Sequence, residues 1–496
     1  MRNGGDMIKK IILLFFIGLL FLSHIWAQDF GFGFGDEDET FQRSGSSLSV
    51  SISGEVSAAV IGYLEDISWG PDNINTRDMF MFSGKLNFLA QSSFAEGVIN
   101  LKLVPALVPV SIDEAYIRAF FGSLDVTAGL KKLTWGRADQ FGPLDIINLP
   151  DSSKIFIEMA DKSNLMGIKI ANPVIHGSFR FGQFSKIEVL FLPSFEIIST
   201  AIKTAISPPN PLMSMIIGTS SAERWMPGEM KNLGRLLGST YEEDEEISIA
   251  QFALKETDTS RLNYAQAGIR FTTTIGRADI GIQYFYGRMF QPAVIFYLPA
   301  GYTSLPEIEF AFNTYHQVGL DYGQVLFGFN IRSEVAANIT EDLSGDNGYI
   351  YNPSIGWSFG FDRDLFLGIN VNLQANGSVR LFNDKVGSSK DPFTFNYYFD
   401  RLVYNPDFDI EAGTSISSTR LTLMLSRKFM RDELELRTAA VWGIEDKDAA
   451  IIPALIWTKE DLQLAFSGSF FLGNTDGQLG QYHANKFLKL SVIYMF

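Results

Sequence analysis

The sequence predicts an all-β chain that folds as a transmembrane antiparallel up-and-down β-barrel of about 18 strands, with about 16 as the alternative. Three observations predict this fold. Apolar and polar residues alternate in many stretches, short connections alternate with long ones, and the last stretch ends on an aromatic residue of an apolar face. The short turns would then lie on the periplasmic side and the long loops on the extracellular side.

Alternation with a period of two is the first observation, and it indicates strands with two chemically different faces. Residues 364–376 place Leu365 and Leu367 on one face and Asn370 and Asn372 on the other. A soluble β-sandwich also alternates, so this pattern alone leaves both folds open.

The spacing of the connections separates a barrel from a sandwich. Tight turns are expected near 92–94, 122, 172–174, 275–277, 321–323, 361–364, 428–431 and 459–461. Longer connections are expected near 65–78, 104–110, 134–161, 193–261, 290–307, 340–349, 381–412, 444–448 and 473–483. A transmembrane barrel alternates short and long connections in this way, whereas a sandwich has no physical reason to do so.

The strand count follows from parity. Residues 162–171, 175–183 and 185–193 can each be read as a strand, which gives an odd total. Single-chain bacterial barrels have an even number of strands. Residues 162–193 are therefore expected to supply two strands, for a total of about 18.

The last strand is the third observation. Leu488, Leu490 and Val492 share a face with Tyr494 and Phe496. A chain that ends in an aromatic residue on such a face resembles the C-terminal signal of bacterial outer-membrane barrels. The resemblance implies that Tyr494 and Phe496 form an assembly signal for the barrel-assembly machinery.

The N-terminal residues predict export. Lys9 and Lys10 precede the apolar run 11–22, and the small residue Ala27 closes the segment. Residues 1–27 are therefore expected to be a cleaved signal peptide. The alternative is a transmembrane anchor, but the apolar run is shorter than the ~20 residues that a spanning helix needs.

The remaining chain divides into two parts. Residues 28–48 are rich in Gly, Phe and acidic side chains, and we expect a flexible acidic arm. Residues 49–496 would form the barrel in a bacterial outer membrane, with lipid as one partner. The arm could instead reach into the lumen as a plug.

Composition excludes several classes of site. The chain has no cysteine, which excludes disulfides, Cys-ligated zinc and thiol nucleophiles. A formal net charge of −16 argues against a nucleic-acid partner. The few His residues fit no catalytic or zinc motif, so we expect neither an enzyme nor a resident cofactor. His316 is expected either to pack on a strand or to line the lumen.

A local pattern spans residues 111–151. It contains the strand sequence Asp113-Glu114-Ala115-Tyr116 and then Trp135, Gly136, Asp139, Asp145, Asn148 and Asp151. This segment resembles one found in several porin-like outer-membrane families, where a DEAY strand precedes a hairpin with a Trp-Gly pair and a loop with Asp and Asn-Pro. Lys132-Leu133 replaces the usual Gln, and Leu149 separates Asn148 from Pro150. The resemblance implies a porin-like barrel and gives no substrate.

The loop at 134–151 also has a simple physical interpretation. Pro143 and Pro150 restrict its backbone, and its Asp and Asn side chains can accept hydrogen bonds from nearby N–H groups. We expect these residues to order the loop. A loop-bound calcium ion is the alternative, although the ligand spacing of an EF-hand is absent.

Polar residues on the expected inward face are candidates for the lining of a pore. They are Glu114, Arg118, Asn330, Arg332, Glu334, Asn370, Asn372, Gln374, Glu433, Glu435 and Arg437. Such charges favour polar, hydrated solutes, or they only pair across strands and hold the barrel. The inward face of 415–427 stays open, because Arg420 and Arg427 fall on opposite faces. The connection 193–261 would be either a lumen constriction or a surface lid.

These observations favour a porin or channel for passive diffusion of small hydrophilic solutes. One alternative is a surface-exposed barrel that acts as an adhesin or binds ligands through its long loops. Another is a gated transporter of hydrophobic molecules with the N-terminal arm as its plug.

Overall fold

The computed structural model describes most of the predicted barrel. The described residues are 48–64, 80–103, 110–140, 142–148, 155–160, 165–195, 253–255, 259–289, 293–297, 307–345, 350–382, 393–396, 401–404, 408–409, 413–414, 416–475 and 477–496. The predicted signal peptide, nearly all of the N-terminal arm, Asp151 and most of the connection 193–261 lie outside them.

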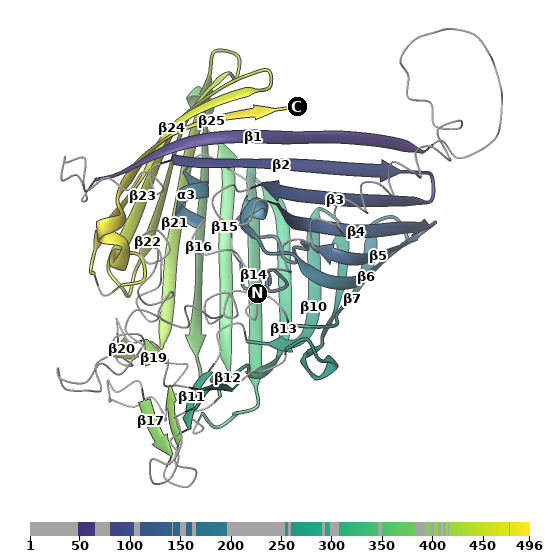
Figure 1. The fold of residues 1–496 in the computed structure, drawn as a ribbon, viewed down its shortest axis with the longest axis vertical. Helices are drawn as coiled ribbons and strands as arrows, with labels where there is room; N and C mark the ends of the chain where they lie inside the picture. The colour runs from purple at the N-terminus through teal and green to yellow at the C-terminus, as the bar shows by residue number, and fades with distance from the viewer. Residues whose placement is uncertain are drawn as a thin grey trace, which may run out of the picture. The chain divides into compact units, whose positions relative to one another are not determined.

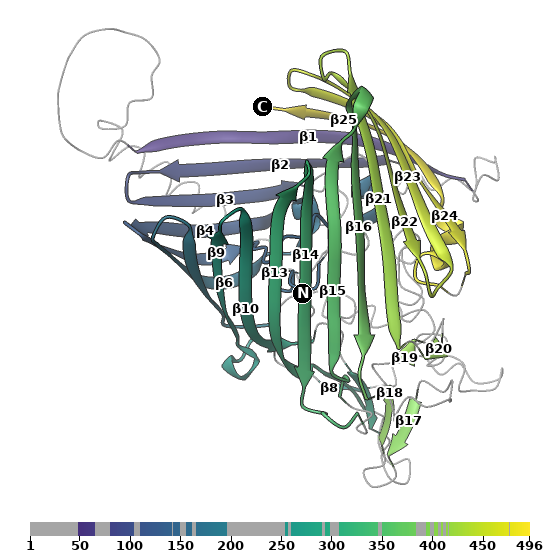
Figure 2. The same ribbon diagram turned by 180° about the vertical axis from the view of Figure 1, so that it is seen from behind.

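An antiparallel sheet of 18 strands closes on itself, because β1 (Ser49–Tyr63) pairs both with β2 (Phe80–Gln91) and with β25 (Phe487–Met495). The strands between them follow in chain order: β3 (Ala95–Leu103), β4 (Ser111–Phe121), β5 (Leu124–Lys131), β6 (Asn172–Phe181), β7 (Ser185–Leu192), β9 (Gln266–Ile275), β10 (Ala278–Arg288), β13 (Thr314–Leu326), β14 (Phe329–Thr340), β15 (Ser354–Asp364), β16 (Ile369–Arg380), β21 (Ser417–Phe429), β22 (Leu434–Gly443), β23 (Asp448–Lys459) and β24 (Leu462–Gly473). Figures 1 and 2 show the strands from two opposite sides. The predicted fold class and strand count are confirmed.

Short helices and two small sheets lie in the connections. The helices are α3 (Ile155–Met159), η2 (Leu165–Ile168), η4 (Leu262–Tyr264), η6 (Phe366–Gly368) and η7 (Gly480–Asn485). One small sheet joins β8 (Ala253–Lys255), β11 (Ala293–Tyr297), β12 (Glu307–Ala311), β17 (Phe393–Asn396) and β18 (Arg401–Tyr404), and the other joins β19 (Phe408–Asp409) and β20 (Gly413–Thr414). Within the described ranges, no helix is long and apolar enough to cross a membrane.

The two faces of the barrel wall differ as the alternation predicts. On β13, Val318 and Leu320 are 46% and 47% exposed on the outside, while Gln317 and Asp321 are almost fully buried on the inside. The pairing of β16 with β21 (Ser417–Phe429) also shows which residues of β21 face inward. Arg420 lies beside Asn376 on the inward face, and Arg427 lies on the outward face. The apolar side chains therefore cover the outside of the barrel, as lipid would require.

The barrel closes where its first and last strands meet. Gly54 and Phe496 exchange two backbone hydrogen bonds of 2.8 and 3.0 Å. The ring of Phe496 covers Gly54 so closely that a Cβ at position 54 would lie 2.7 Å from it. Tyr494 and Phe496 are both half-exposed on the outward face.

Several local predictions are wrong. Residues 162–193 supply two strands as expected, but 165–168 form the helix η2, and the turn predicted at 172–174 lies inside β6. The turn predicted at 321–323 lies inside β13, and the true turn follows Leu326. Asp and Gly are typical of turns, but here Asp321 and Gly323 face inward from a strand, where both lie against the side chain of Arg137.

Candidate functional site: the lumen loop

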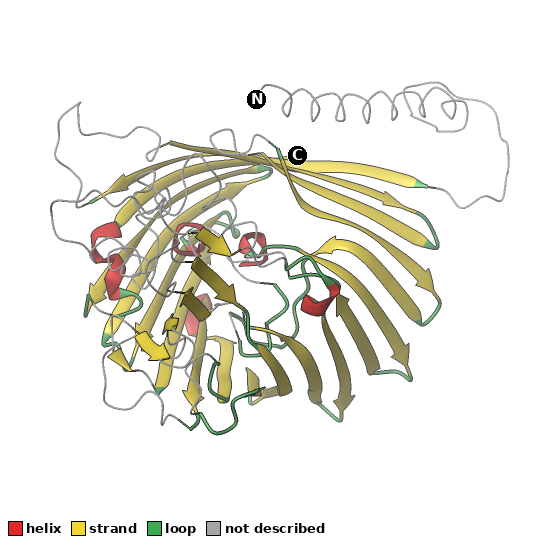
Figure 3. Ribbon diagram, turned by 60° about the horizontal axis from the view of Figure 1, so that its bottom comes forward, coloured by secondary structure: helices red, strands yellow, loops and turns green. Residues whose placement is uncertain are grey.

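The long connection between β5 and β6 turns into the barrel. We call its residues 134–148 the lumen loop; the structure describes all of them except residue 141. Figure 3 shows loop segments and short helices inside the ring of strands. The lumen loop lies against the inward faces of β9, β10 and β13–β16, which the following contacts define.

Glu334 on β14 holds one turn of the lumen loop. Its carboxylate accepts hydrogen bonds from the backbone N–H groups of Arg137, Ala138 (2.7 Å) and Leu144 (3.4 Å). Glu334 is 4% exposed, so these charge-assisted bonds replace the water that its carboxylate has lost. The loop therefore wraps its backbone around a side chain of the barrel wall.

Two glycines allow this close approach. A Cβ at Gly136 or Gly142 would collide with the Glu334 carboxylate. Gly136 also has a φ of +97°, which disfavours any other residue. The Trp-Gly pair of the sequence pattern therefore has a structural reason, since Gly136 makes room for Glu334.

A chain of polar contacts runs from Arg137 into the wall. The Arg137 Nε donates to Asp321 at 2.5 Å, and the other carboxylate oxygen of Asp321 accepts from Arg270 at 2.7 Å. Arg270 also donates to Gln283 at 2.7 Å, and Gln283 donates to Gln317 at 2.9 Å. One buried carboxylate thus serves two guanidinium groups, one from the loop and one from the wall.

The same two glutamines hold the far end of the loop. Gln317 donates to the carbonyl of Pro143 at 3.0 Å, and Gln283 donates to the carbonyl of Leu144 at 3.3 Å. These bonds satisfy backbone groups that would otherwise be buried without a partner.

Asp139 forms a third attachment. It pairs with Arg332 and accepts a 2.8 Å hydrogen bond from Asn372, while Arg332 also pairs with Asp362 at 2.8 Å. The neighbouring backbone N–H of Gln140 donates to Gln374 at 3.1 Å.

The base of the loop is held by Asn148 and Asp145. Asn148 accepts from the Leu133 N–H at 2.6 Å and donates to the Ile170 carbonyl at 2.7 Å. Asp145 pairs with Lys169 at 2.6 Å. Burial raises the pKa of Asp145 above its usual range, although the Lys169 ammonium opposes this shift.

Apolar contacts complete the attachment. Trp135 and Leu144 are 2% and 0% exposed. Each fits over a wall glycine, because a Cβ at Gly268 would lie 2.7 Å from the Trp135 ring and a Cβ at Gly319 would collide with Leu144.

After the lumen loop, the connection reaches a different part of the wall. The helix α3 joins an apolar cluster with Ile452, Phe471 and Phe487. Lys489 donates to the Ile157 carbonyl at 3.1 Å, and Ser469 donates to the Phe156 carbonyl at 3.3 Å. The β5–β6 connection is thus fixed on β9, β10 and β13–β16 by its first half and on β23–β25 by α3.

The sequence-predicted residues fall into three groups. Arg332, Glu334, Asn372 and Gln374 meet at the lumen loop. Glu114 and Arg118 lie on β4, where Glu114 accepts from Asn100 and the Lys132 N–H, and Arg118 pairs with Asp125 and Glu96. The remaining residues are Asn330 on β14 near a short turn, Asn370 bonded to Asp364, Glu433 in the turn before β22, and Glu435 paired with Arg437 at 3.7 Å.

The outcome for the predicted loop motif is mixed. Asn148 orders nearby backbone as expected, but Asp139 and Asp145 bind the distant Arg332 and Lys169 instead of local N–H groups. Across the described residues, no group of three or more His, Asp or Glu side chains is placed to hold a metal ion. His316 lies on the outward face and bonds Tyr284 at 2.7 Å, so it does not line the lumen.

Sequence reasoning missed Arg137, Arg270, Gln283, Gln317 and Asp321. Their signal was present but weak. Each of the four wall residues occupies an inward position of an alternating strand, and the wall glycines Gly268 and Gly319 share that face.

Similar folds occur among solved structures. OpdL of Pseudomonas aeruginosa has 9% sequence identity and a TM-score of 0.45, over 90% of this chain and 98% of that one. A BenF-like porin of Pseudomonas fluorescens has 8% identity and a TM-score of 0.45, over 90% and 98%. The outer-membrane channel DcaP of Acinetobacter baumannii has 10% identity and a TM-score of 0.38, over 92% and 99%. No protein-family model matches the sequence, and no curated protein matches it.

Proposed function

We propose that this chain is a porin of a bacterial outer membrane, through which small hydrophilic solutes diffuse passively. The closed barrel with an apolar outside and a polar inside carries this proposal. Closure satisfies the backbone hydrogen bonds that lipid cannot satisfy. A barrel of about 16–18 strands leaves an aqueous lumen too wide for side chains alone to fill.

The lumen loop would set the width and polarity of the path. It occupies one side of the lumen and turns its polar groups toward β9, β10 and β13–β16, where Glu334, Asp321 and Arg332 hold it. A solute would pass between the lumen loop and the opposite wall. Diffusion needs no catalytic group and no resident cofactor, and the polar lining favours hydrated solutes over apolar ones.

The pore-lining role of the predicted residues follows from the same proposal. Arg118 lies on the inward face of β4, away from the contacts of the lumen loop, and would border the open part of the lumen. Glu114 also faces inward on β4 but bonds the N–H of Lys132 near the start of the loop, and Arg437 on β22 is almost fully buried. The cleaved signal peptide at 1–27, the assembly signal at Tyr494 and Phe496, and the calcium alternative remain proposals as well.

Planar-bilayer recording of the purified, refolded protein tests the function. We expect stable single-channel steps whose conductance rises with bulk salt. A protein that inserts as a folded barrel but gives no conductance would contradict the proposal.

One observation favours the second candidate, a barrel that binds ligands through its long connections. The five-stranded small sheet combines backbone from three of these connections, namely β8, β11 with β12, and β17 with β18. Such a sheet could present a binding surface. Removing β17 and β18 would abolish adhesion but leave conductance unchanged if this candidate is right.

A further inference from the structure

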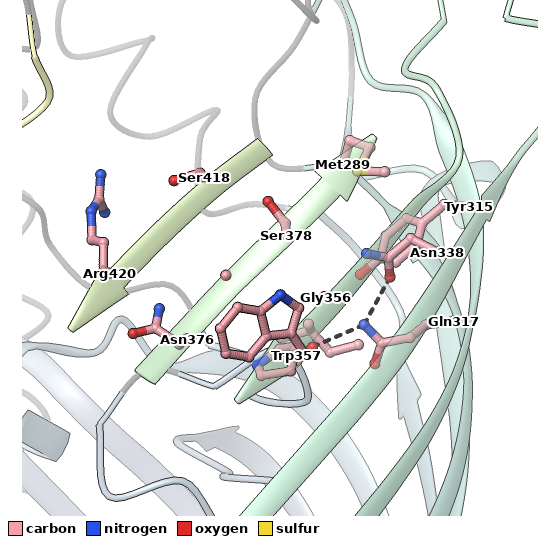
Figure 4. A pocket seen from close by; sticks show the side chains of 13 residues that line it. Met289, Tyr315, Gln317, Asn338, Gly356, Trp357, Asn376, Ser378, Ser418 and Arg420 are labelled. Atoms are coloured by element: carbon pink, nitrogen blue, oxygen red, sulfur yellow. Dashed lines mark hydrogen bonds between the residues drawn. The ribbon is translucent and has the colours of Figure 1, made fainter. Parts of the chain in front are cut away.

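A pocket of about 390 Å³ lies beside the lumen loop. Figure 4 shows the side chains that border it. They come from the lumen loop, from the residue that follows β10, and from β13, β14, β15, β16 and β21. The ones that carry the argument are Pro143, Ile146, Met289, Asn376, Ser378 and Ser418. This volume lies within the range of protein sites for small ligands.

The pocket lies on the long-connection side of the lumen loop. On β14, Asn338 borders the pocket, whereas Glu334, which holds the loop, is closer to the short turn. On β16, Ser378 borders the pocket, and Gln374 bonds the loop. A solute that enters from the long-connection side therefore reaches the pocket before it passes the lumen loop.

Free hydrogen-bonding groups line one side of the pocket. Ser378 and Ser418 face each other across β16 and β21, and Asn376 is the next inward residue on β16. Within the described part of the chain, these three side chains make no hydrogen bond, so an amide and two hydroxyl groups are available to a ligand.

The charges near the pocket are already offset. Arg420, the one charged side chain among the described residues that border it, donates to Gln478 and lies 4.0 Å from the Asp446 carboxylate. Arg137, Arg270 and Arg332 are all paired with carboxylates of the loop and wall. The side chains left to bind a solute are therefore mainly uncharged polar ones.

An apolar surface faces these polar groups. Pro143 and Ile146 of the lumen loop contribute hydrocarbon, and Met289 adds its thioether side chain. A ligand that fits both sides has hydroxyl groups along one edge and C–H groups on a face. Sugars have this combination.

We propose that the pocket is a binding site for a neutral polyhydroxylated solute of monosaccharide size, placed at the entrance to the lumen loop. Asn376, Ser378 and Ser418 hydrogen-bond its hydroxyl groups, and Pro143 and Ile146 contact its C–H face. This inference rests on the porin function proposed above and adds a substrate class to it.

Galactose block of the single-channel current tests the site. We expect galactose to reduce the current in a saturable way. The double variant Asn376→Leu, Ser418→Ala removes two groups that would hydrogen-bond the sugar but changes the side-chain volumes little. The half-blocking concentration of galactose should therefore rise about tenfold. Asn87→Leu, which changes an inward amide on β2 away from the pocket, is the matched control and should leave the block unchanged.

Two results would overturn the proposal. In one, galactose neither blocks a conducting channel nor binds the detergent-solubilised protein in equilibrium dialysis. In the other, galacturonate blocks at a much lower concentration than galactose and Arg420→Gln removes that difference, which would make the pocket an anion site. Loss of all conductance would contradict the porin function instead, and equilibrium dialysis would then decide the pocket separately.

Discussion

The β5–β6 connection attaches to the barrel by two different kinds of contact. The lumen loop is held by hydrogen bonds and ion pairs, above all those of the buried carboxylates of Glu334 and Asp321. The helix α3 is held mainly by apolar burial beside Phe471 and Phe487. Hydrogen-bonded charges specify one position, whereas apolar packing tolerates substitutions of similar volume. The difference predicts that single substitutions release the two halves independently.

Asp321→Ala should have the largest effect. It leaves Arg137 and Arg270 without their shared buried carboxylate, and breaking such a pair costs about 3–5 kcal/mol. Amide hydrogen exchange should show faster opening of residues 137–144 and unchanged protection of α3. The matched control is Asp279→Asn, since Asp279 contacts Arg137 at 3.3 Å from a more exposed position. Equal exchange in both variants would contradict the account.

Ile157→Ala should release the apolar half. Ile157 is 8% exposed, and truncation of a buried aliphatic side chain to Ala costs about 2–5 kcal/mol. Exchange should quicken in residues 155–160 while the lumen loop stays protected. Ile170→Ala, a more exposed position in the same connection, is the control. Loss of protection in both halves would show that they open as one unit.

Glu334→Gln should have a smaller effect on the lumen loop. The amide keeps one acceptor oxygen and the side-chain volume, but it loses the charge that strengthens three backbone hydrogen bonds. We expect a cost of about 2 kcal/mol. Amide hydrogen exchange of Ala138 and Leu144 measures this cost. Slower exchange than in the parent protein would contradict the role of Glu334 in holding the lumen loop.

Salt should have the smallest effect. The ion pair between Asp139 and Arg332 is partly exposed, so added salt should weaken it slightly, whereas the buried Asp321 contacts should change little. Exchange at residues near 139, measured at low and high salt, tests this. A larger salt effect on α3 than on the lumen loop would contradict the comparison.

The fold could be predicted from the sequence because a barrel wall repeats one local rule. Inward and outward residues alternate, and this rule placed Arg332, Glu334, Asn372 and Gln374 on one face. The attachment of the lumen loop could not be predicted in the same way. Glu334 and the N–H of Arg137 are nearly two hundred residues apart in the chain, and no local pattern records their contact.

The choice of a lumen segment illustrates the same limit. Length and an apolar middle favoured the connection 193–261, most of which lies outside the described residues, and that hypothesis stays a prediction. For the shorter connection 134–151, the sequence predicts only that its side chains order the loop, or alternatively that they bind a calcium ion. Its glycines at 136 and 142 make sense only beside Glu334, which the sequence does not place there.

The central claim is that the lumen loop narrows an open, water-filled barrel. The most direct test compares the single-channel conductance of the full chain with that of a variant in which residues 135–147 are replaced by a short Gly-Ser linker. We predict a folded barrel with clearly higher conductance, because the loop no longer occupies the lumen. A folded barrel with unchanged conductance would contradict the claim.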